Sequence, residues 1–356
     1  MEDLQIWAER EETSSIGKRT KRIIASMQQA VIADAFGLDH VKVVEAPEPV
    51  PGPGEVLVRM KAWSLNYRDY LVATGRYNPR MPLPRVLLSD GSGEVVSDGK
   101  RWKRGDRVAG IFMQRWLSGP YRDGLGDSSL GAQQEGVLAE YVALNEEGLV
   151  AIPAHLTYEE AATLPCAAVT AWNALFESGS IHPGQTVLVE GSGGVSVFAL
   201  QFAKAAGARV VATSSSAEKR ERLTAMGADW VLDYKAEPEW GKLIAKAGGV
   251  DHVVEVGGVG TMSQALTAVK AGGHVSVIGI LTGRTGEINI AQILHKHITV
   301  QGIYVGSREM FERLNRALTQ LHLKPVIDST FEFARIQEAL RYMESAGHFG
   351  KIVISL

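Results

Sequence analysis

One glycine-rich turn in the sequence has the composition of a phosphate-binding loop. The apolar segment TVLVE (186–190) runs directly into the turn, and a helix-like segment follows. The turn consists of Gly191, Ser192, Gly193, Gly194, Val195 and Ser196. Gly191 permits a tight turn, Gly193 lets the backbone approach a pyrophosphate, and the first amides of the helix bind its oxygens. Such a string alone is weak evidence, and Ser196 replaces the third glycine, so the strand–turn–helix setting carries the prediction of a dinucleotide site.

The residues after the next apolar segment indicate which dinucleotide is bound. An NAD site places an acidic residue there, where it binds the ribose 2′-hydroxyl. This chain instead has Ser214, Ser215 and Ser216, with Lys219 and Arg220 close behind. Hydroxyl donors and cations suit a 2′-phosphate, so the sequence predicts NADPH rather than NADH. The serines can also cap the following helix, and the two roles are compatible.

Alternating apolar strands and helices position this turn. From about residue 151 to 281 the pattern predicts a doubly wound parallel sheet, because its strand segments are almost wholly apolar. A long helical stretch at 157–179 precedes it, with Thr157 and Glu160 spaced as a capping box. Residues 27–150 show short strands separated by Gly, Pro and Asp, which indicates a compact, partly closed β domain.

Composition restricts the function classes. The 356 residues carry a formal net charge of −3 with one cysteine, Cys166, which argues against nucleic-acid binding and against a disulfide framework. No apolar run is long enough to span a membrane, and no signal peptide is visible. We expect a soluble cytoplasmic protein that acts on a small molecule. The polar residues 1–26 differ from the rest, and we expect a disordered extension there.

Seven motifs, in order, resemble the medium-chain dehydrogenase/reductase superfamily over residues 27–356. They are NYRD (66–69), SDGSGEVV (89–96), GDRVAG (105–110), GVLAEYV (136–142), TAWNAL (170–175), GSGGVS (191–196) and QGIYVGSRE (301–309). The likeness is to the branch of zinc-independent quinone oxidoreductase-like and zinc-type alcohol dehydrogenase-like proteins. It implies an α/β fold, with a GroES-like, partly closed β-barrel catalytic domain at 27–150 that 298–356 complete. A Rossmann doubly wound nucleotide-binding domain would occupy 151–297.

The resemblance also bears on a metal. Zinc-dependent members of the superfamily place a cysteine ligand where this chain has Asn66 and a histidine ligand where it has Asp90. Their four-cysteine structural lobe has no counterpart in this sequence. A zinc site needs three protein ligands, and Asp90 alone does not supply them. We therefore expect no catalytic zinc.

Without a metal, hydride transfer is easier to an acceptor that spreads the resulting charge, such as a quinone or a C=C bond conjugated to a carbonyl. The reduced oxygen then needs a hydrogen-bond donor or a proton. Candidate catalytic residues are Asn66, Tyr67, Tyr70 and Tyr77. Resemblance to enoyl reductases places a catalytic tyrosine at Tyr77, and resemblance to quinone reductases places Asn66 beside the nicotinamide. Each tyrosine can equally be a packing residue.

Further cofactor contacts follow only from the resemblance. Thr170 would face the nicotinamide, and Tyr234 would lie near the adenosine phosphate. Gly257 would follow the fourth strand of the sheet and residues 278–280 the fifth, at the carboxyl ends where ligands bind. The implied contacts after the fifth strand and around the nicotinamide and phosphates are Ile278, Gly279, Ile280, Ile303, Tyr304, Val305, Phe349, Gly350 and Lys351. Lys351 can instead be a solvated surface charge.

Several alternatives and lesser features complete the expectations. The chain could be an alcohol or aldehyde dehydrogenase, or a non-catalytic NADPH-binding sensor or structural protein. Cys166 lies in an apolar helical segment, where a structural role is expected. The loop 113–135 is long enough to cover a substrate cleft, with Trp116 and Tyr121 able to shape specificity. We expect a homodimer, with GGHVSVIGI (272–280) as the pairing strand.

Overall fold

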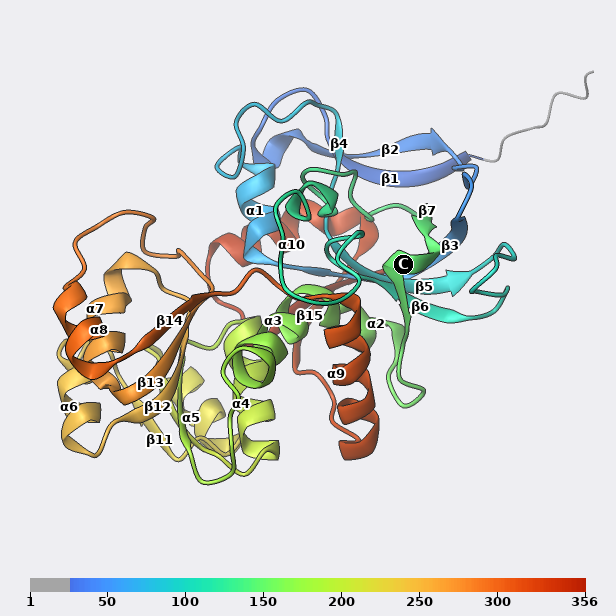
Figure 1. The fold of residues 1–356 in the computed structure, drawn as a ribbon. Coiled ribbons are helices and arrows are strands. Elements are labelled where there is room, and N and C mark those ends of the chain that lie inside the picture. Colours follow the sequence, from blue (N-terminus) through green and yellow to red (C-terminus); the bar gives the residue numbers. More distant parts are fainter. Residues whose placement is uncertain (1–25) are drawn as a thin grey trace, which may run out of the picture.

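The computed structural model describes residues 26–356, and the expectation for the N-terminal extension lies outside the described residues apart from Ser26, which begins the first strand. The described chain forms one parallel sheet, one antiparallel sheet and one mixed sheet. The parallel sheet and its helices occupy the lower left of Figure 1, and the antiparallel and mixed sheets lie above and to the right of it. This arrangement confirms the predicted α/β class.

The parallel sheet has six strands, and its order is β11-β10-β9-β12-β13-β14. Their bounds are β9 Thr186–Glu190, β10 Arg209–Thr213, β11 Trp230–Leu232, β12 Val250–Glu255, β13 Val269–Val277 and β14 Thr299–Gly302. The order reverses at β9, so a crevice opens at the carboxyl ends of β9 and β12, which is where dinucleotides bind in such sheets. The flanking helices are α4 Gly194–Ala205, α5 Ala217–Ala225, α6 Trp240–Lys246, α7 Val259–Ala268 and α8 Ile290–Lys296.

The expected dimer strand is not an edge strand. β13 is hydrogen-bonded to β12 on one side and to β14 on the other, so residues 272–280 cannot pair with a second copy. This part of the prediction was wrong because the sequence gives no sign that Thr299–Gly302 adds a sixth strand. β14 is the free edge, and all four of its residues are exposed.

The seven-stranded sheet is mixed, with β15 and β16 parallel and the other pairs antiparallel, and it joins strands from distant parts of the chain. Its strands follow the order β15-β16-β3-β5-β6-β8, and β7 also pairs with β3. The bounds are β3 Glu55–Leu65, β5 Asp90–Val95, β6 Arg107–Gly110, β7 Tyr141–Asn145, β8 Leu149–Ala151, β15 Ile327–Glu332 and β16 Lys351–Ser355. β16 lies antiparallel to β3, with Ile354 opposite Trp63 in a shared core. Residues 352–355 of β16 therefore pair with residues 62–65 of β3, although the two strands lie far apart in the sequence.

A three-stranded sheet and several helices complete the fold. The sheet has the order β2-β1-β4, from β1 Ser26–Ile32, β2 Val41–Pro47 and β4 Arg85–Val86. The remaining α-helices are α1 Tyr67–Ala73, α2 Tyr158–Ala162, α3 Val169–Trp172, α9 Arg308–Leu321 and α10 Ile336–Glu344. Short 3-10 helices span Leu38–His40, Gly126–Ser128, Glu146–Gly148 and Phe333–Arg335. Of the helices in residues 26–356, none has the length and apolar character that crossing a membrane requires.

The stretch expected to be one long helix at 157–179 is interrupted. π-helical segments at Leu164–Ala168 and Asn173–Glu177 flank α3 and separate it from α2. The capping box is confirmed, because Glu160 N donates to Thr157 Oγ1 over 3.2 Å and Thr157 N donates to the Glu160 carboxylate over 2.8 Å. π-helical turns often occur at functional sites, and the first of them contains Cys166.

Candidate functional site

The glycine-rich turn leaves its backbone accessible to a ligand. Gly191 has a φ of 74°, in the left-handed region that favours glycine, and Gly193 is the N-cap of α4. A Cβ built on either residue would meet no atom of residues 26–356 within 4 Å. Ser196, at the third glycine position, is buried and its hydroxyl donates to the Glu190 carbonyl over 2.6 Å. The local geometry therefore fits the predicted pyrophosphate contact and accounts for the serine.

The segment 349–351 is hydrogen-bonded to this turn. Gly350 N donates to the Ser192 carbonyl over 2.9 Å, and Gly193 and Gly350 form a parallel β-bridge. A Cβ on Gly194 would lie 2.7 Å from Cδ of Lys351, so the aliphatic chain of that lysine passes over the first residue of α4. Residues 349–351 and the turn therefore lie together, as the resemblance implied.

Lys351 joins the turn to Asn66. Its side chain is buried, and Nζ donates to the Leu65 carbonyl over 2.7 Å and to Asn66 Oδ1 over 2.6 Å. The alternative of a solvated surface charge is wrong. Because the ammonium holds Oδ1, the amide nitrogen Nδ2 of Asn66 is directed toward Ser89 Oγ, 3.4 Å away. The lysine fixes which end of the amide is a donor.

The neighbouring polar groups do not form a zinc site. Asp90 is fully buried, and its carboxylate accepts from Ser89 Oγ over 2.7 Å and from Cys166 N over 3.0 Å. Burial, together with the Asp90 charge, raises the pKa of the Cys166 thiol to about 12, so the thiol keeps its proton at neutral pH. The Asn66 amide oxygen is already bound to an ammonium, and the Asp90 carboxylate already accepts two hydrogen bonds, so these two positions supply no zinc ligand set. Within residues 26–356, no three His, Cys, Asp or Glu side chains gather as a metal site would need.

Asp69 adds a buried acid beneath this cluster. One of its oxygens accepts from Asn66 N over 2.8 Å, which caps α1, and the other has no partner among the described residues. Burial raises the pKa of Asp69 to about 6 despite the opposing charge of Arg68.

Tyr77, in the segment after α1, contacts Tyr304, in the segment after β14. Their hydroxyl oxygens are 2.8 Å apart, and either can donate. Burial and this contact raise the pKa of Tyr304 well above its usual value. The Tyr304 ring also packs near Phe112 and near Tyr121 of the loop 113–135, with centroid distances of 6.0 and 6.3 Å. The loop therefore reaches the aromatic cluster, defined here as Tyr77, Phe112, Tyr121 and Tyr304.

The other two candidate tyrosines lie elsewhere. Tyr70 is buried, and its hydroxyl donates to Glu344 of α10 over 2.8 Å. Tyr67 packs against Tyr70 with a centroid distance of 5.7 Å. The Tyr70 hydroxyl is thus engaged away from the Tyr77–Tyr304 pair, which favours the packing role for Tyr70, and the role of Tyr67 stays a prediction.

The predicted 2′-phosphate residues lie at the carboxyl end of β10 and the start of α5. Ser216 caps α5 by accepting from Lys219 N over 3.3 Å, so the capping role of the serines is confirmed for this one. Ser214 is buried and Ser215 half-buried. Lys219 Nζ donates to the Ala346 carbonyl over 2.7 Å, and Arg220 pairs with Asp233 over 2.7 Å. Lys219 and Arg220 thus lie beside the three serines, and each of the two cations already bonds to another group of the protein.

Other predicted contacts surround the same crevice. Thr170 is buried, and its hydroxyl donates to the Cys166 carbonyl over 2.6 Å. Residues 278–280 pack on the segment after β12, since a Cβ on Gly279 would overlap the Val256 carbonyl and Thr282 bonds Gly257. Tyr234, Ile280 and Tyr304 are exposed, whereas Ile303, Val305 and Phe349 are buried, as are Gly350 and Lys351. The carbonyl of Val305 accepts from Asn173 Nδ2 over 2.8 Å, and Phe349 lies under the guanidinium of Arg222 at 4.0 Å.

Sequence reasoning missed two buried glutamates in this crevice. Glu190 and Glu255 are the last residues of the adjacent parallel strands β9 and β12, and both are buried. Glu255 accepts from the amides of Gly257 and Gly258 over 3.1 and 3.0 Å. Burial and the Glu255 charge raise the pKa of Glu190 well above its usual range. The signal was available, because two acids ending neighbouring parallel strands must meet.

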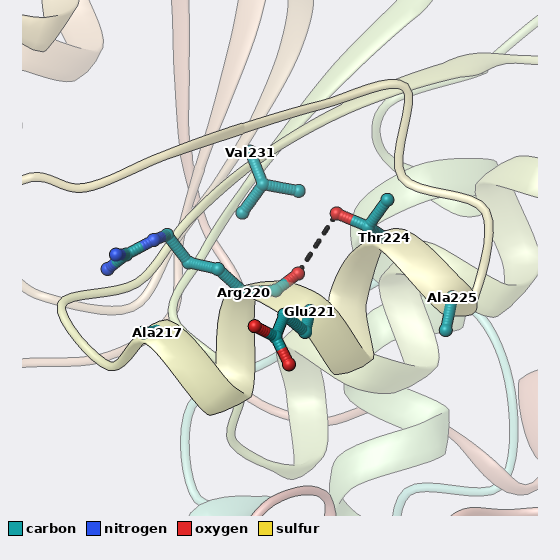
Figure 2. A pocket seen from close by; sticks show the side chains of 6 residues that line it. All are labelled: Ala217, Arg220, Glu221, Thr224, Ala225 and Val231. Atoms are coloured by element: carbon teal, nitrogen blue, oxygen red, sulfur yellow. Dashed lines mark hydrogen bonds between the residues drawn. The ribbon is translucent and has the colours of Figure 1, made fainter.

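A separate hollow of about 520 Å³ lies on α5 and β11. Figure 2 shows Arg220, Glu221 and Thr224 along the helix and Val231 opposite, with Thr224 Oγ1 bonded to the Arg220 carbonyl. It shares Arg220 with the predicted 2′-phosphate residues, but neither Asn66 nor the aromatic cluster lines it.

Known proteins match this chain along most of its length. Residues 52–154 match the alcohol dehydrogenase GroES-like domain, and residues 194–320 match the zinc-binding dehydrogenase family. A zinc-type alcohol dehydrogenase-like protein of Schizosaccharomyces pombe is 40% identical, over 93% of this chain and 99% of that protein. A 2-methylene-furan-3-one reductase of Solanum lycopersicum is 34% identical, over 90% of this chain and 76% of that protein.

Solved structures agree. A Sinorhizobium meliloti 1021 protein named as an alcohol dehydrogenase superimposes with a TM-score of 0.85 at 42% identity, covering 93% of this chain and 99% of that one. An NAD-dependent alcohol dehydrogenase gives 0.84 at 33% identity, covering 93% and 100%. A 2-octenoyl-CoA carboxylase reductase in complex with NADP gives 0.81 at 28% identity, covering 93% and 87%. The chain therefore belongs to the medium-chain dehydrogenase/reductase superfamily, in its zinc-type alcohol dehydrogenase-like branch, and is an oxidoreductase of the kind that uses a nicotinamide cofactor.

Proposed function

We propose that this protein is an NADPH-dependent reductase that transfers hydride, without zinc, to a quinone or to a C=C bond conjugated with a carbonyl. The observation that carries the proposal is the 2.6 Å contact between Lys351 Nζ and Asn66 Oδ1. Where zinc-dependent members have a cysteine ligand, this chain has an amide oxygen already bound to a cation. An acceptor that delocalises the incoming charge needs no Lewis acid at that point.

The residues present fit a nicotinamide dinucleotide. Gly191 and Gly193 would lie against its pyrophosphate, and the first amides of α4 would bind the phosphate oxygens. Asn66, with its amide nitrogen directed by Lys351, would line the reacting end. When bound, the cofactor supplies the hydride. The protein's own part is to hold the reacting groups together and to provide a proton donor.

NADPH is proposed from the residues after β10. The solved relatives are named with NAD in one case and NADP in another, so the names do not decide between the nucleotides. Three serines and two cations follow β10, and no acidic residue stands among Ser214, Ser215 and Ser216. A 2′-phosphate would gain charge-assisted hydrogen bonds there, in competition with Asp233 for Arg220.

Conjugated acceptors are favoured by the proton donors and by the names of relatives. The Tyr77–Tyr304 hydroxyl pair is a donor with one partly exposed member, so its proton can be replaced from solvent. One relative is named for a 2-methylene-furan-3-one and another for 2-octenoyl-CoA, both conjugated carbonyl compounds. Other relatives are named as alcohol dehydrogenases, which keeps C=O reduction as the second candidate.

The test is oxidation of NADPH by the purified protein with a panel of quinones, conjugated enones and simple aldehydes, in the presence of a metal chelator. Turnover of a quinone or enone, with a hydroquinone or saturated ketone as product, is the expected result. An unsaturated alcohol as the product would move the assignment to C=O reduction. Saturable NADPH binding without turnover on any acceptor would indicate the non-catalytic alternative.

A further inference from the structure

The guanidinium of Arg68 is a buried cation whose hydrogen-bonding capacity is largely unused. Arg68 lies in α1, two residues after Asn66, and its Nη2 donates to the Leu130 carbonyl. Its Nε and Nη1 are buried and have no hydrogen-bond partner among residues 26–356. A guanidinium carries five N–H donors, and buried donors that are left unpaired destabilise the folded state.

Comparison with other arginines sets Arg68 apart. In residues 26–356, three further arginines have a buried nitrogen without a partner, and they are Arg59, Arg85 and Arg308. Each of these pairs with a glutamate, Glu94, Glu135 and Glu147 respectively. Arg68 has a backbone carbonyl in place of a carboxylate. Two of its nitrogens therefore lack an oxygen partner among residues 26–356, and its charge lowers the pKa of the neighbouring Asp69.

Arg68 lies beside two aromatic rings. Its Cζ lies 4.2 Å from the Phe112 ring centroid and 5.6 Å from that of Tyr77, so it adjoins the aromatic cluster. The rings of the aromatic cluster can stack on a flat conjugated acceptor, and the planar Arg68 guanidinium can bind an oxygen at the end of that acceptor.

We propose that Arg68 binds the carbonyl oxygen of the acceptor and stabilises the negative charge that develops there. This inference rests on the proposed reductase function and narrows its substrates to acceptors with a carbonyl conjugated to the carbon that is reduced. The acceptor takes a hydride at that carbon, its π electrons shift, and the C=O pair moves onto the oxygen beside Arg68. A proton from the Tyr77–Tyr304 pair completes the product. The acceptor gains two electrons, which the reduced nicotinamide loses.

The experiment compares Arg68→Met and Arg68→Lys with the wild type, each loaded with NADP(H). Arg80→Met is the matched control, since Arg80 is an exposed arginine in the same segment. We expect Arg68→Met to lower kcat/KM for an enone by about 10²–10³-fold, as loss of an oxyanion donor does. Arg68→Lys keeps the charge without the fork and should recover part of the loss, and Arg80→Met should stay within about twofold of the wild type.

A binding measurement separates a direct contact from a structural effect. 2-Hydroxy-1,4-naphthoquinone is a vinylogous acid and therefore an anion at neutral pH, and its charged oxygen resembles the oxygen of the reduced acceptor. It should bind the wild type and Arg80→Met alike, and Arg68→Met much more weakly, with NADPH affinity unchanged in all three. Equal binding and turnover in Arg68→Met would overturn the proposal, as would a loss of NADPH affinity equal to the loss of turnover.

Two further outcomes are also decisive. If Arg68→Met does not fold, Arg68→Lys decides, because full turnover by this variant overturns the proposal and reduced turnover with normal NADPH affinity supports it. If the wild type reduces no quinone or enone, the proposed function fails. The hydroxynaphthoquinone measurement then still tests whether Arg68 binds an anionic oxygen.

Discussion

The ammonium of Lys351 lies 2.6 Å from Oδ1 of Asn66, although 285 residues separate them in the chain. We predict that Lys351→Met lowers kcat about tenfold to a hundredfold while the KM for NADPH changes little, because the Asn66 amide loses the contact that fixes its orientation. Lys351→Arg should restore part of the rate. Steady-state kinetics on an enone checks this, with thermal unfolding as the control for folding. Unchanged kcat in a folded Lys351→Met would contradict it.

Substitutions in the Tyr77–Tyr304 pair can show which of the two hydroxyl groups donates the proton. If Tyr77 delivers the proton, Tyr77→Phe lowers kcat by about 10²–10⁴-fold, the usual contribution of general acid catalysis. Tyr304→Phe leaves the Tyr77 hydroxyl in place and should cost much less. Tyr70→Phe serves as the packing control, since its hydroxyl bonds to Glu344. Equal, small effects of all three would remove Tyr77 from the mechanism.

Nucleotide preference can be reversed at Ser215. A carboxylate introduced by Ser215→Asp would repel a 2′-phosphate and accept a hydrogen bond from a ribose 2′-hydroxyl. We expect the KM for NADPH to rise roughly tenfold or more and that for NADH to fall. Lys242→Gln, which alters an exposed charge on α6, is the control. A variant whose two KM values move together would show that Ser215 does not face the 2′ position.

The Glu190–Glu255 pair predicts a specific pH dependence of stability. Burial and the Glu255 charge raise the pKa of Glu190 in the folded state, so the folded protein binds a proton there more tightly than the unfolded chain does. Stability from this group is therefore lost as pH rises above the ordinary glutamate value of 4.5. Glu190→Gln should gain in unfolding free energy relative to the wild type as pH rises.

Denaturant unfolding of both proteins between pH 4 and pH 8 measures this difference. Glu237→Gln, at an exposed glutamate, should show a flat difference over the same range. A flat difference for Glu190→Gln as well would mean that Glu190 is ionised in the folded protein.

A homodimer remains a prediction, now with a different edge. Val300 of β14 is 39% exposed, and the apolar Ile290 and Leu294 of α8 are exposed as well. Placing a charge on a pairing edge opposes association, so Val300→Lys should shift a dimer to a monomer in sedimentation analysis. Leu321→Lys, at an exposed leucine of α9, should leave the oligomeric state unchanged. A wild-type monomer would contradict the prediction outright.

The sequence predicted the local features of this protein better than its long-range contacts. The glycine turn, the serine cap and the alternating strands were readable because each depends on neighbouring residues. The Lys351–Asn66 contact, the Tyr77–Tyr304 pair and the sixth strand of the parallel sheet depend on how distant segments pack, and residue type alone does not report that. Lys351 shows this most clearly, because a lysine in a terminal turn is ordinarily solvated.

The position of β16 has a consequence for biosynthesis. This strand is the last of the chain, and it lies between β15 and β3 in the interior of the seven-stranded sheet. During translation β3 emerges long before β16 and cannot acquire this neighbour until residues 351–355 have been made. The parallel sheet, whose strands lie between residues 186 and 302, can form beforehand. In that interval the side of β3 that β16 later covers would be open to chaperones, while its other neighbours, β5 and β7, are already present.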